Sequence, residues 1–189
     1  MTVPNSKTEP DSVLEQLPGD LMMWVLIASE LAVFGAGLTA FLAIRITDPA
    51  GFAAAQDLLH RPAGAINTMI LITSGFFAAR AVAAVAAENR CAAGLWLAAS
   101  ALGGVAFLAV KADEYRDLMA EGVGTETHPF FTFYYLLTGF HAAHVLAGIL
   151  ILALIAWEDS HRNMETGAAF WHMVDLVWVL LFPVIYLLR

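Results

Sequence analysis

Cysteine, charge and enzyme-like motifs are all scarce in this sequence of 189 residues. The single cysteine, Cys91, excludes an internal disulfide and any iron–sulfur or metal site that needs several cysteines. Only 14% of the residues are charged, and the formal net charge of -8 argues against a nucleic-acid-binding protein, which needs basic patches. The sequence has no nucleophile elbow, no phosphate-binding glycine loop and no HExxH or CxxC pattern. Nothing in it therefore indicates an enzyme that acts alone.

Apolar residues are abundant instead, at 60% of the chain, whereas soluble domains are about half apolar. A bilayer core about 30 Å thick needs about 20 apolar residues in a helix. Five segments meet this requirement, at about Leu21–Ile44, Ala63–Ala87, Ala92–Val110, Phe130–Trp157 and Ala168–Leu188. We therefore predict an all-α, polytopic membrane protein whose five transmembrane helices form one bundle over residues 20–189.

Residues 1–19 differ from the rest of the chain in composition. They are polar, contain three prolines and lack the apolar run of a cleaved signal peptide, so we expect a polar N-terminal tail. Asp20 is the candidate N-cap of the first span. Lysine and arginine are almost evenly divided between the two sides of the bundle, so charge alone does not predict the orientation.

Glu30 is the most informative single residue, because it is an ionisable group deep in the membrane. It lies ten residues after Asp20 and therefore about 15 Å into the first span. A charged carboxylate there is costly, so the group should be protonated or paired inside the bundle. One interpretation is a carboxyl that relays protons, and the other is a hydrogen bond to a neighbouring helix. The absence of an internal repeat and of an evident chain of carboxyls disfavours transport. A small proton-conducting or transport protein that uses Glu30 remains the alternative function.

Three histidines and an aspartate lie within the last two spans. His141 and His144 share one face of the fourth span, and His172 and Asp175 share one face of the fifth. Histidines on two helices can hold a b-type haem, which would make the chain an electron carrier. Polar contacts between helices, or with lipid or a partner, fit the same spacing, and we favour these over haem or another metal.

A run of charged residues follows the third span, from Lys111 to Asp117. We interpret it as a solvated helix end with local ion pairs. Glu114 and Arg116 within it are candidates for contact with lipid or a partner.

Motifs on all five spans carry a resemblance to a known family. They are Leu26-Ile27-Ala28-Ser29-Glu30, Asn67-Thr68 with Ser74-Gly75, Glu114-Tyr115, Thr138-Gly139-Phe140-His141 with His144-Val145 and Gly148, and Phe170-Trp171-His172 with Asp175, Trp178 and Phe182. The chain resembles subunit III of the haem–copper oxidases, and its five-helix form is most similar to the NorE-type members associated with nitric oxide reduction.

The resemblance implies a haem-free accessory subunit of a respiratory terminal oxidase or nitric oxide reductase. Such a subunit has no catalytic residue and no metal of its own, and haem with copper or iron belongs to the catalytic partner. It also implies phospholipid in a cleft between helices, a buried carboxyl at Glu30, and a bacterial inner membrane location with a cytoplasmic N-terminus and a periplasmic C-terminus. Lys111, where the family often has glutamine, and the unusual Arg80 are departures that leave the enzyme served unidentified.

Overall fold

The computed structural model describes residues 21–158 and 161–188, and within them every regular element is a helix. Five helices are long and apolar enough to cross a membrane. They are α1 (Leu21–Arg45), α3 (Arg61–Ala86), α4 (Arg90–Ala120), α5 (Pro129–Glu158) and α6 (His161–Phe182), which continues into the π-helical turn η2 (Pro183–Leu187). The five predicted spans are confirmed. The predicted tail and the Asp20 cap lie outside the described residues.

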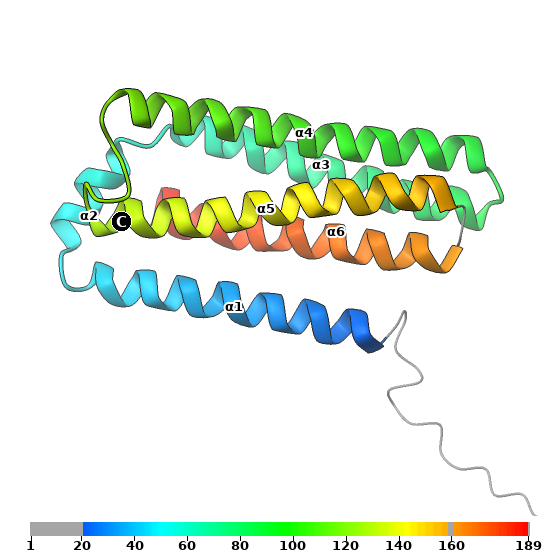
Figure 1. Cartoon of the computed structure of the whole chain (residues 1–189), viewed down its shortest axis with the longest axis horizontal. Coiled ribbons are helices and arrows are strands. Elements are labelled where there is room, and N and C mark those ends of the chain that lie inside the picture. Colours follow the sequence, from blue (N-terminus) through cyan, green and yellow to red (C-terminus); the bar gives the residue numbers. More distant parts are fainter. Residues whose placement is uncertain (1–20, 159–160, 189) are drawn as a thin grey trace, which may run out of the picture.

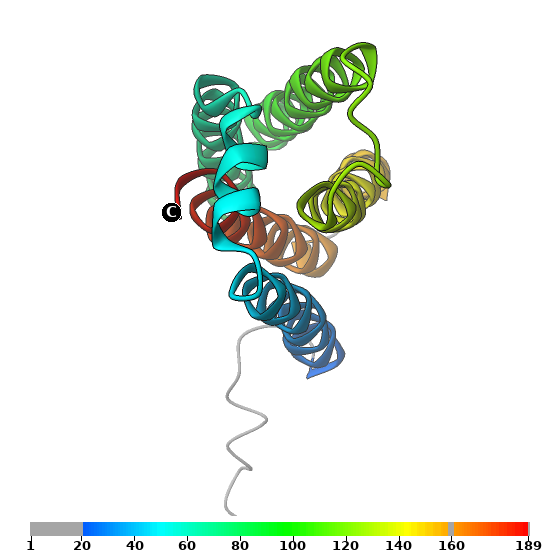
Figure 2. The ribbon, with the colours of Figure 1, turned by 90° about the vertical axis from the view of Figure 1, so that its left-hand side faces the viewer.

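The helices are arranged in layers, as Figures 1 and 2 show. The α3–α4 hairpin forms one outer layer, α5 and α6 form the middle, and α1 lies on the opposite side against α5 and α6. Of the five spans α6 is the most enclosed and α1 the least. The bundle therefore has α6 at its centre and presents most of α1 to the surroundings.

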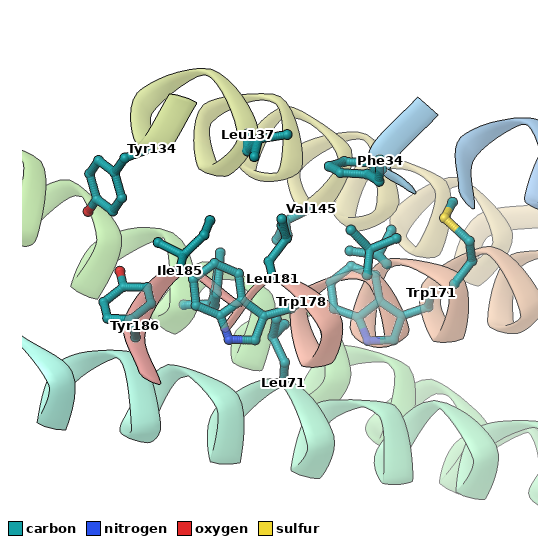
Figure 3. Packing of buried hydrophobic residues seen from close by; sticks show 14 of the residues in the cluster. Phe34, Leu71, Tyr134, Leu137, Val145, Trp171, Trp178, Leu181, Ile185 and Tyr186 are labelled. Atoms are coloured by element: carbon teal, nitrogen blue, oxygen red, sulfur yellow. The ribbon is translucent and has the colours of Figure 1, made fainter. Parts of the chain in front are cut away.

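Aromatic side chains fill the middle of the bundle. Trp171 and Trp178 of α6 are fully enclosed, with Leu71 of α3 on one side and Phe34 and Val145 on the other (Figure 3). Large rings are compatible with close helices because small residues lie opposite them: a Cβ on Gly104 or Gly148 would lie 2.5 or 2.6 Å from the Trp171 ring. This close packing, rather than water exclusion, is what stabilises helices against each other in lipid.

A short helix that we did not predict, α2 (Pro49–Asp57), crosses one end of the bundle. Asp48 caps it by accepting a hydrogen bond from the Gly51 amide, and Pro49 occupies the first turn, where a missing N–H costs nothing. The fully enclosed Gln56 donates to the carbonyl of Ile185 at 2.7 Å, so α2 is tied to the end of α6.

Two predicted boundaries are wrong. The third span continues as helix to Ala120, ten residues beyond its predicted end, because its charged run keeps a buried face. The last helix begins at His161 instead of Ala168, since its first turns are polar but still helical. At the other end of α6, Pro183 cannot donate an amide, and the chain widens into η2, which Leu188 closes by donating to the Pro183 carbonyl.

Candidate functional site

Glu30 of α1 faces His144 of α5, with Glu30 Oε2 and His144 Nε2 3.1 Å apart. The side chains are 21% and 15% exposed, so the pair is largely shielded by Phe34 and Phe140, which pack against the His144 ring. The two atoms are close but not aligned as a regular hydrogen bond. Glu30 therefore lies beside a histidine of a neighbouring helix inside the bundle.

The second nitrogen of His144 determines what this pair can do. His144 Nδ1 lies 2.8 Å from the Phe140 carbonyl, which can only accept, so Nδ1 carries a proton. Nε2 can then either accept a hydrogen bond from a protonated Glu30 carboxyl or carry a proton itself, as an imidazolium beside the carboxylate. Both forms leave the pair neutral, which is the arrangement that a low-dielectric position tolerates.

His141 is completely enclosed and lies among aromatic rings from three neighbouring helices. Its ring lies 5.2 Å from Trp178, 5.4 Å from Phe107 and 6.3 Å from Phe34, measured between centroids. Neither ring nitrogen has a hydrogen-bond partner within residues 21–158 and 161–188. His141 therefore contacts neighbouring helices, which is one of the contacts expected from the sequence, and its side chain does not reach the surface of this chain.

His172 and Asp175 of α6 lie in a different environment, against α3. Their closest atoms, His172 Nδ1 and Asp175 Oδ2, are 3.8 Å apart, which is too long for a hydrogen bond. The Asp175 carboxyl presses on Gly75, where a Cβ would lie 2.1 Å from Oδ2. His172 is half-exposed while Asp175 is nearly enclosed. His172 and Asp175 share one face of α6, as predicted. They lie apart from His141 and His144, which both pack against Phe34.

A cleft of about 600 Å³ opens between α1, α3 and α6 beside His172. Its wall is mostly apolar, with Glu165, Thr166 and His172 as its polar side chains. Neither Glu30 nor His141 lines it. The apolar lining includes Met23, Trp24, Ile27, Val82, Met173 and Leu176.

A buried polar cluster that sequence reasoning missed joins α4, α5 and η2. Lys111 and Glu114 are only 2% and 3% exposed and form an ion pair at 2.9 Å. Lys111 Nζ also donates to the hydroxyls of Tyr134, at 3.0 Å, and Tyr186, at 2.6 Å. The ammonium thus uses all three of its protons, and it lies within 5.3 Å of the ring centroids of Tyr115 and Trp178.

The interpretation of the whole charged run as solvated is therefore wrong for Lys111 and Glu114. It is correct for the rest: Arg116 is 73% exposed and pairs with Asp113 at 3.0 Å. Glu114, one of the expected contacts with lipid or a partner, is enclosed by this chain's own helices, whereas Arg116 is free to meet either. The signal that could have separated them is spacing, since Phe107, Lys111, Glu114 and Leu118 recur at three or four residues along the buried face of α4.

Comparison with known proteins identifies the family. Residues 21–189 match the family model described as cytochrome c oxidase subunit III. A cytochrome c oxidase subunit 3 of Synechocystis is 32% identical over 89% of this chain and 76% of its own length. A cytochrome bo(3) ubiquinol oxidase subunit 3 of Pseudomonas aeruginosa is 30% identical over 87% of this chain and 82% of its own length.

A third relative contains a similar sequence within a longer polypeptide. The heme-copper oxidase subunit I+III of Aeropyrum pernix is 32% identical over 87% of this chain, which covers 22% of that protein. The match to the family model extends over all five membrane spans, α1 to α6. The chain is a multi-pass membrane protein that belongs to the cytochrome c oxidase subunit III family.

Proposed function

We propose that this chain is a haem-free accessory subunit that packs beside the catalytic subunit of a haem–copper terminal oxidase and stabilises it. The observation that carries the proposal is the way the polar groups of the membrane region are distributed. They form three separate clusters, at Glu30–His144, at His172–Asp175 and at Lys111–Glu114, with the aromatic core between them. A transporter or proton channel that uses Glu30 would need these groups to line one path.

The choice of enzyme rests on the relatives. Those compared above are subunits of cytochrome c, ubiquinol and heme-copper oxidases, which supports a role in aerobic electron transport. A NorE-type role beside a nitric oxide reductase, in denitrification, is the alternative that the experiment below separates from it. In either case haem and copper or iron are carried by the catalytic partner.

We further propose that the cleft between α1, α3 and α6 holds phospholipid. Its apolar wall suits an acyl chain, and its few polar side chains, His172 among them, suit a headgroup region. His144, His172, Asp175 and Arg116 are the expected contacts with lipid or the catalytic partner. Because the number of spans is odd, the start of α1 and the end of η2 lie on opposite sides of the membrane. The proposed orientation has the start of α1 on the cytoplasmic side of a bacterial inner membrane and η2 on the periplasmic side.

The test is purification of the tagged chain from its native membranes in mild detergent, followed by a visible spectrum and mass spectrometry of the co-purifying chains. We expect a haem-bearing catalytic subunit whose haem spectrum is lost when the tagged chain is isolated in harsher detergent. Oxygen consumption by the purified complex supports the oxidase, and nitric oxide consumption supports the reductase instead. Haem that stays with the isolated chain, or a colourless chain without a partner, would overturn the proposal.

A further inference from the structure

Two rows of residues on the α3–α4 hairpin line a groove on the outer face of the bundle. On α3 the row is spaced at three or four residues and comprises Ile66, Ile70, Thr73 and Phe77; on α4 it comprises Ala99, Leu102, Gly103 and Ala106. Such spacing places each row on one helix face. The groove between the rows has a volume of about 620 Å³ and an almost entirely apolar wall. The two helices that line it, α3 and α4, form the layer on the side opposite α1 (Figure 2).

Towards the α3–α4 turn, each row continues with a residue that can interact with a charged headgroup. Arg80 follows Phe77 on α3, and Trp96 precedes Ala99 on α4. The guanidinium carbon of Arg80 lies 5.6 Å from the centroid of the Trp96 ring, and Trp96 also packs on Phe77 at 5.5 Å. The apolar groove therefore ends, on the side of the α3–α4 turn, at a cation held against an indole.

The depth of Arg80 suits the edge of the membrane. Arg80 is six residues before the end of α3, and Trp96 is six residues after the start of α4, so both lie about 9 Å from the turn. An arginine at this depth extends its head towards the headgroup region, and tryptophan is typical of the same level. Arg80 is exposed, and in residues 21–158 and 161–188 no carboxylate lies within ion-pair distance of it.

Thr73 and Ser74 are the polar side chains in the lining of the groove, and both are uncharged. Ser74 donates to the Ser100 carbonyl at 2.7 Å and accepts from Trp171 Nε1 at 3.1 Å, so its hydroxyl is already in use. Gly103 packs directly on Ser74, where a Cβ would lie 2.7 Å from the Ser74 Cβ. Among the side chains that the structure describes, Arg80 has no carboxylate partner, so the groove combines one such cation at its end with a mostly apolar wall.

We propose that this groove binds an anionic phospholipid, with an acyl chain between α3 and α4 and the phosphate on Arg80. A guanidinium matches a phosphate in shape and charge, and the Trp96 ring lies beside it at 5.6 Å. The groove is separate from the cleft between α1, α3 and α6, because the Arg80 head turns towards α4. An apolar helix of a partner protein is the rival occupant. It would bring an acidic side chain to Arg80.

The test compares phosphatidylglycerol and phosphatidylcholine with identical acyl chains, added to the delipidated complex in detergent and counted by native mass spectrometry. The intact protein should bind phosphatidylglycerol in preference. Arg80→Gln should reduce that preference about fivefold, the contribution of one cation near a lipid surface, and Arg80→Lys should retain most of it. Glycerol 3-phosphate, which has the headgroup charge without the chain, should not displace the lipid.

Two further substitutions separate the groove from general effects. Ala99→Phe fills the groove while leaving Arg80 in place, and it should weaken binding of both lipids at this site. Ala153→Phe, on an exposed face of α5, makes the same change of size elsewhere and should alter neither. Unchanged preference in Arg80→Gln would overturn the proposal, and so would a photo-crosslinker at position 99 that captures a polypeptide instead of lipid.

Discussion

Lys111 of α4 donates a hydrogen bond of 2.6 Å to the hydroxyl of Tyr186 in η2, across 75 residues of sequence. That hydroxyl in turn donates to the Glu114 carboxylate, with both oxygens at 2.9 Å. Lysine, tyrosine and glutamate therefore close a ring in which each proton has an acceptor. The ring also explains the position of η2, since the wide turn that follows Pro183 carries Tyr186 to the face of α4.

Removing Lys111 should destabilise the protein strongly, because it leaves Glu114 buried without its counter-ion. We expect Lys111→Met to lower the free energy of unfolding by about 3–5 kcal/mol, as measured by denaturant titration in mixed micelles. The double variant Lys111→Met with Glu114→Leu should recover much of this loss, because no charge then remains buried. Arg116→Ala breaks only an exposed pair on the same helix and should have little effect. A Lys111→Met variant as stable as the parent would contradict the role assigned to the ring.

The helices were predictable from the sequence, but the short helix across the end of the bundle was not. Long apolar runs locate membrane spans because the bilayer has a fixed thickness. Pro49–Asp57 has neither the length nor the composition of a span, and its position depends on the tertiary contact between Gln56 and the end of α6. Contacts of that kind leave no local pattern.

The candidate site was predicted only in part, for a related physical reason. Depth along a helix identified Glu30 as a group that needs a partner, but it did not identify His144 as that partner. The aromatic enclosure of His141 likewise depends on rings from α1, α4 and α6. Lys111 was wrongly interpreted as solvated because it is charged. A lysine can be buried when it has hydrogen-bond acceptors, and one of these, Tyr186 in η2, lies 75 residues away in the sequence.

Gly75 is required for close contact between α3 and α6. In Gly75→Ala the new methyl group would overlap the Asp175 carboxyl, so we expect a loss of about 1–3 kcal/mol in the free energy of unfolding. Asp175→Ala in the same chain should relieve the overlap and restore most of the stability. The matched control is Gly35→Ala on α1, where nothing lies within 4 Å, and helix propensity alone predicts no loss. Equal effects at the two glycines would refute this assignment.

Glu30→Gln should leave assembly and initial activity of the complex largely intact. A glutamine amide has nearly the shape of a protonated carboxyl and can donate to His144 Nε2 in the same way. The check is the yield of complex after purification, together with its initial turnover. Infrared spectra of the parent and variant would show whether a protonated carboxyl band disappears. Failure of the variant to assemble would mean that the pair requires the carboxylate with an imidazolium.

His172→Ala and Asp175→Ala should weaken the hold on lipid or on the catalytic partner, since His172 lines the cleft and Asp175 lies beside it. The measurement is the amount of catalytic subunit and phospholipid retained through successive detergent washes. Thr47→Ala, at the other end of the bundle, is a useful comparison because it changes an exposed polar group outside the cleft. Retention equal to that of the parent in both α6 variants would exclude this role for the cleft.

Asp48 should make the end of the bundle sensitive to acid. The hydrogen bond from the Gly51 amide, followed by the one with His128, lowers the pKa of Asp48 below its ordinary value. A carboxyl whose pKa is lowered by folding adds stability above its unfolded pKa, about 4, and that stability is lost as the pH falls through the folded value. Hydrogen exchange of α2 should therefore be faster in Asp48→Ala than in the parent at neutral pH, and the difference should vanish once Asp48 is protonated.

Asp48→Asn keeps an oxygen for the Gly51 amide and should protect α2 at both pH values, because asparagine caps helices as well as aspartate does. If instead Asp48→Ala exchanges like the parent at neutral pH, α2 is held by Gln56 and the apolar contacts of Phe52 alone.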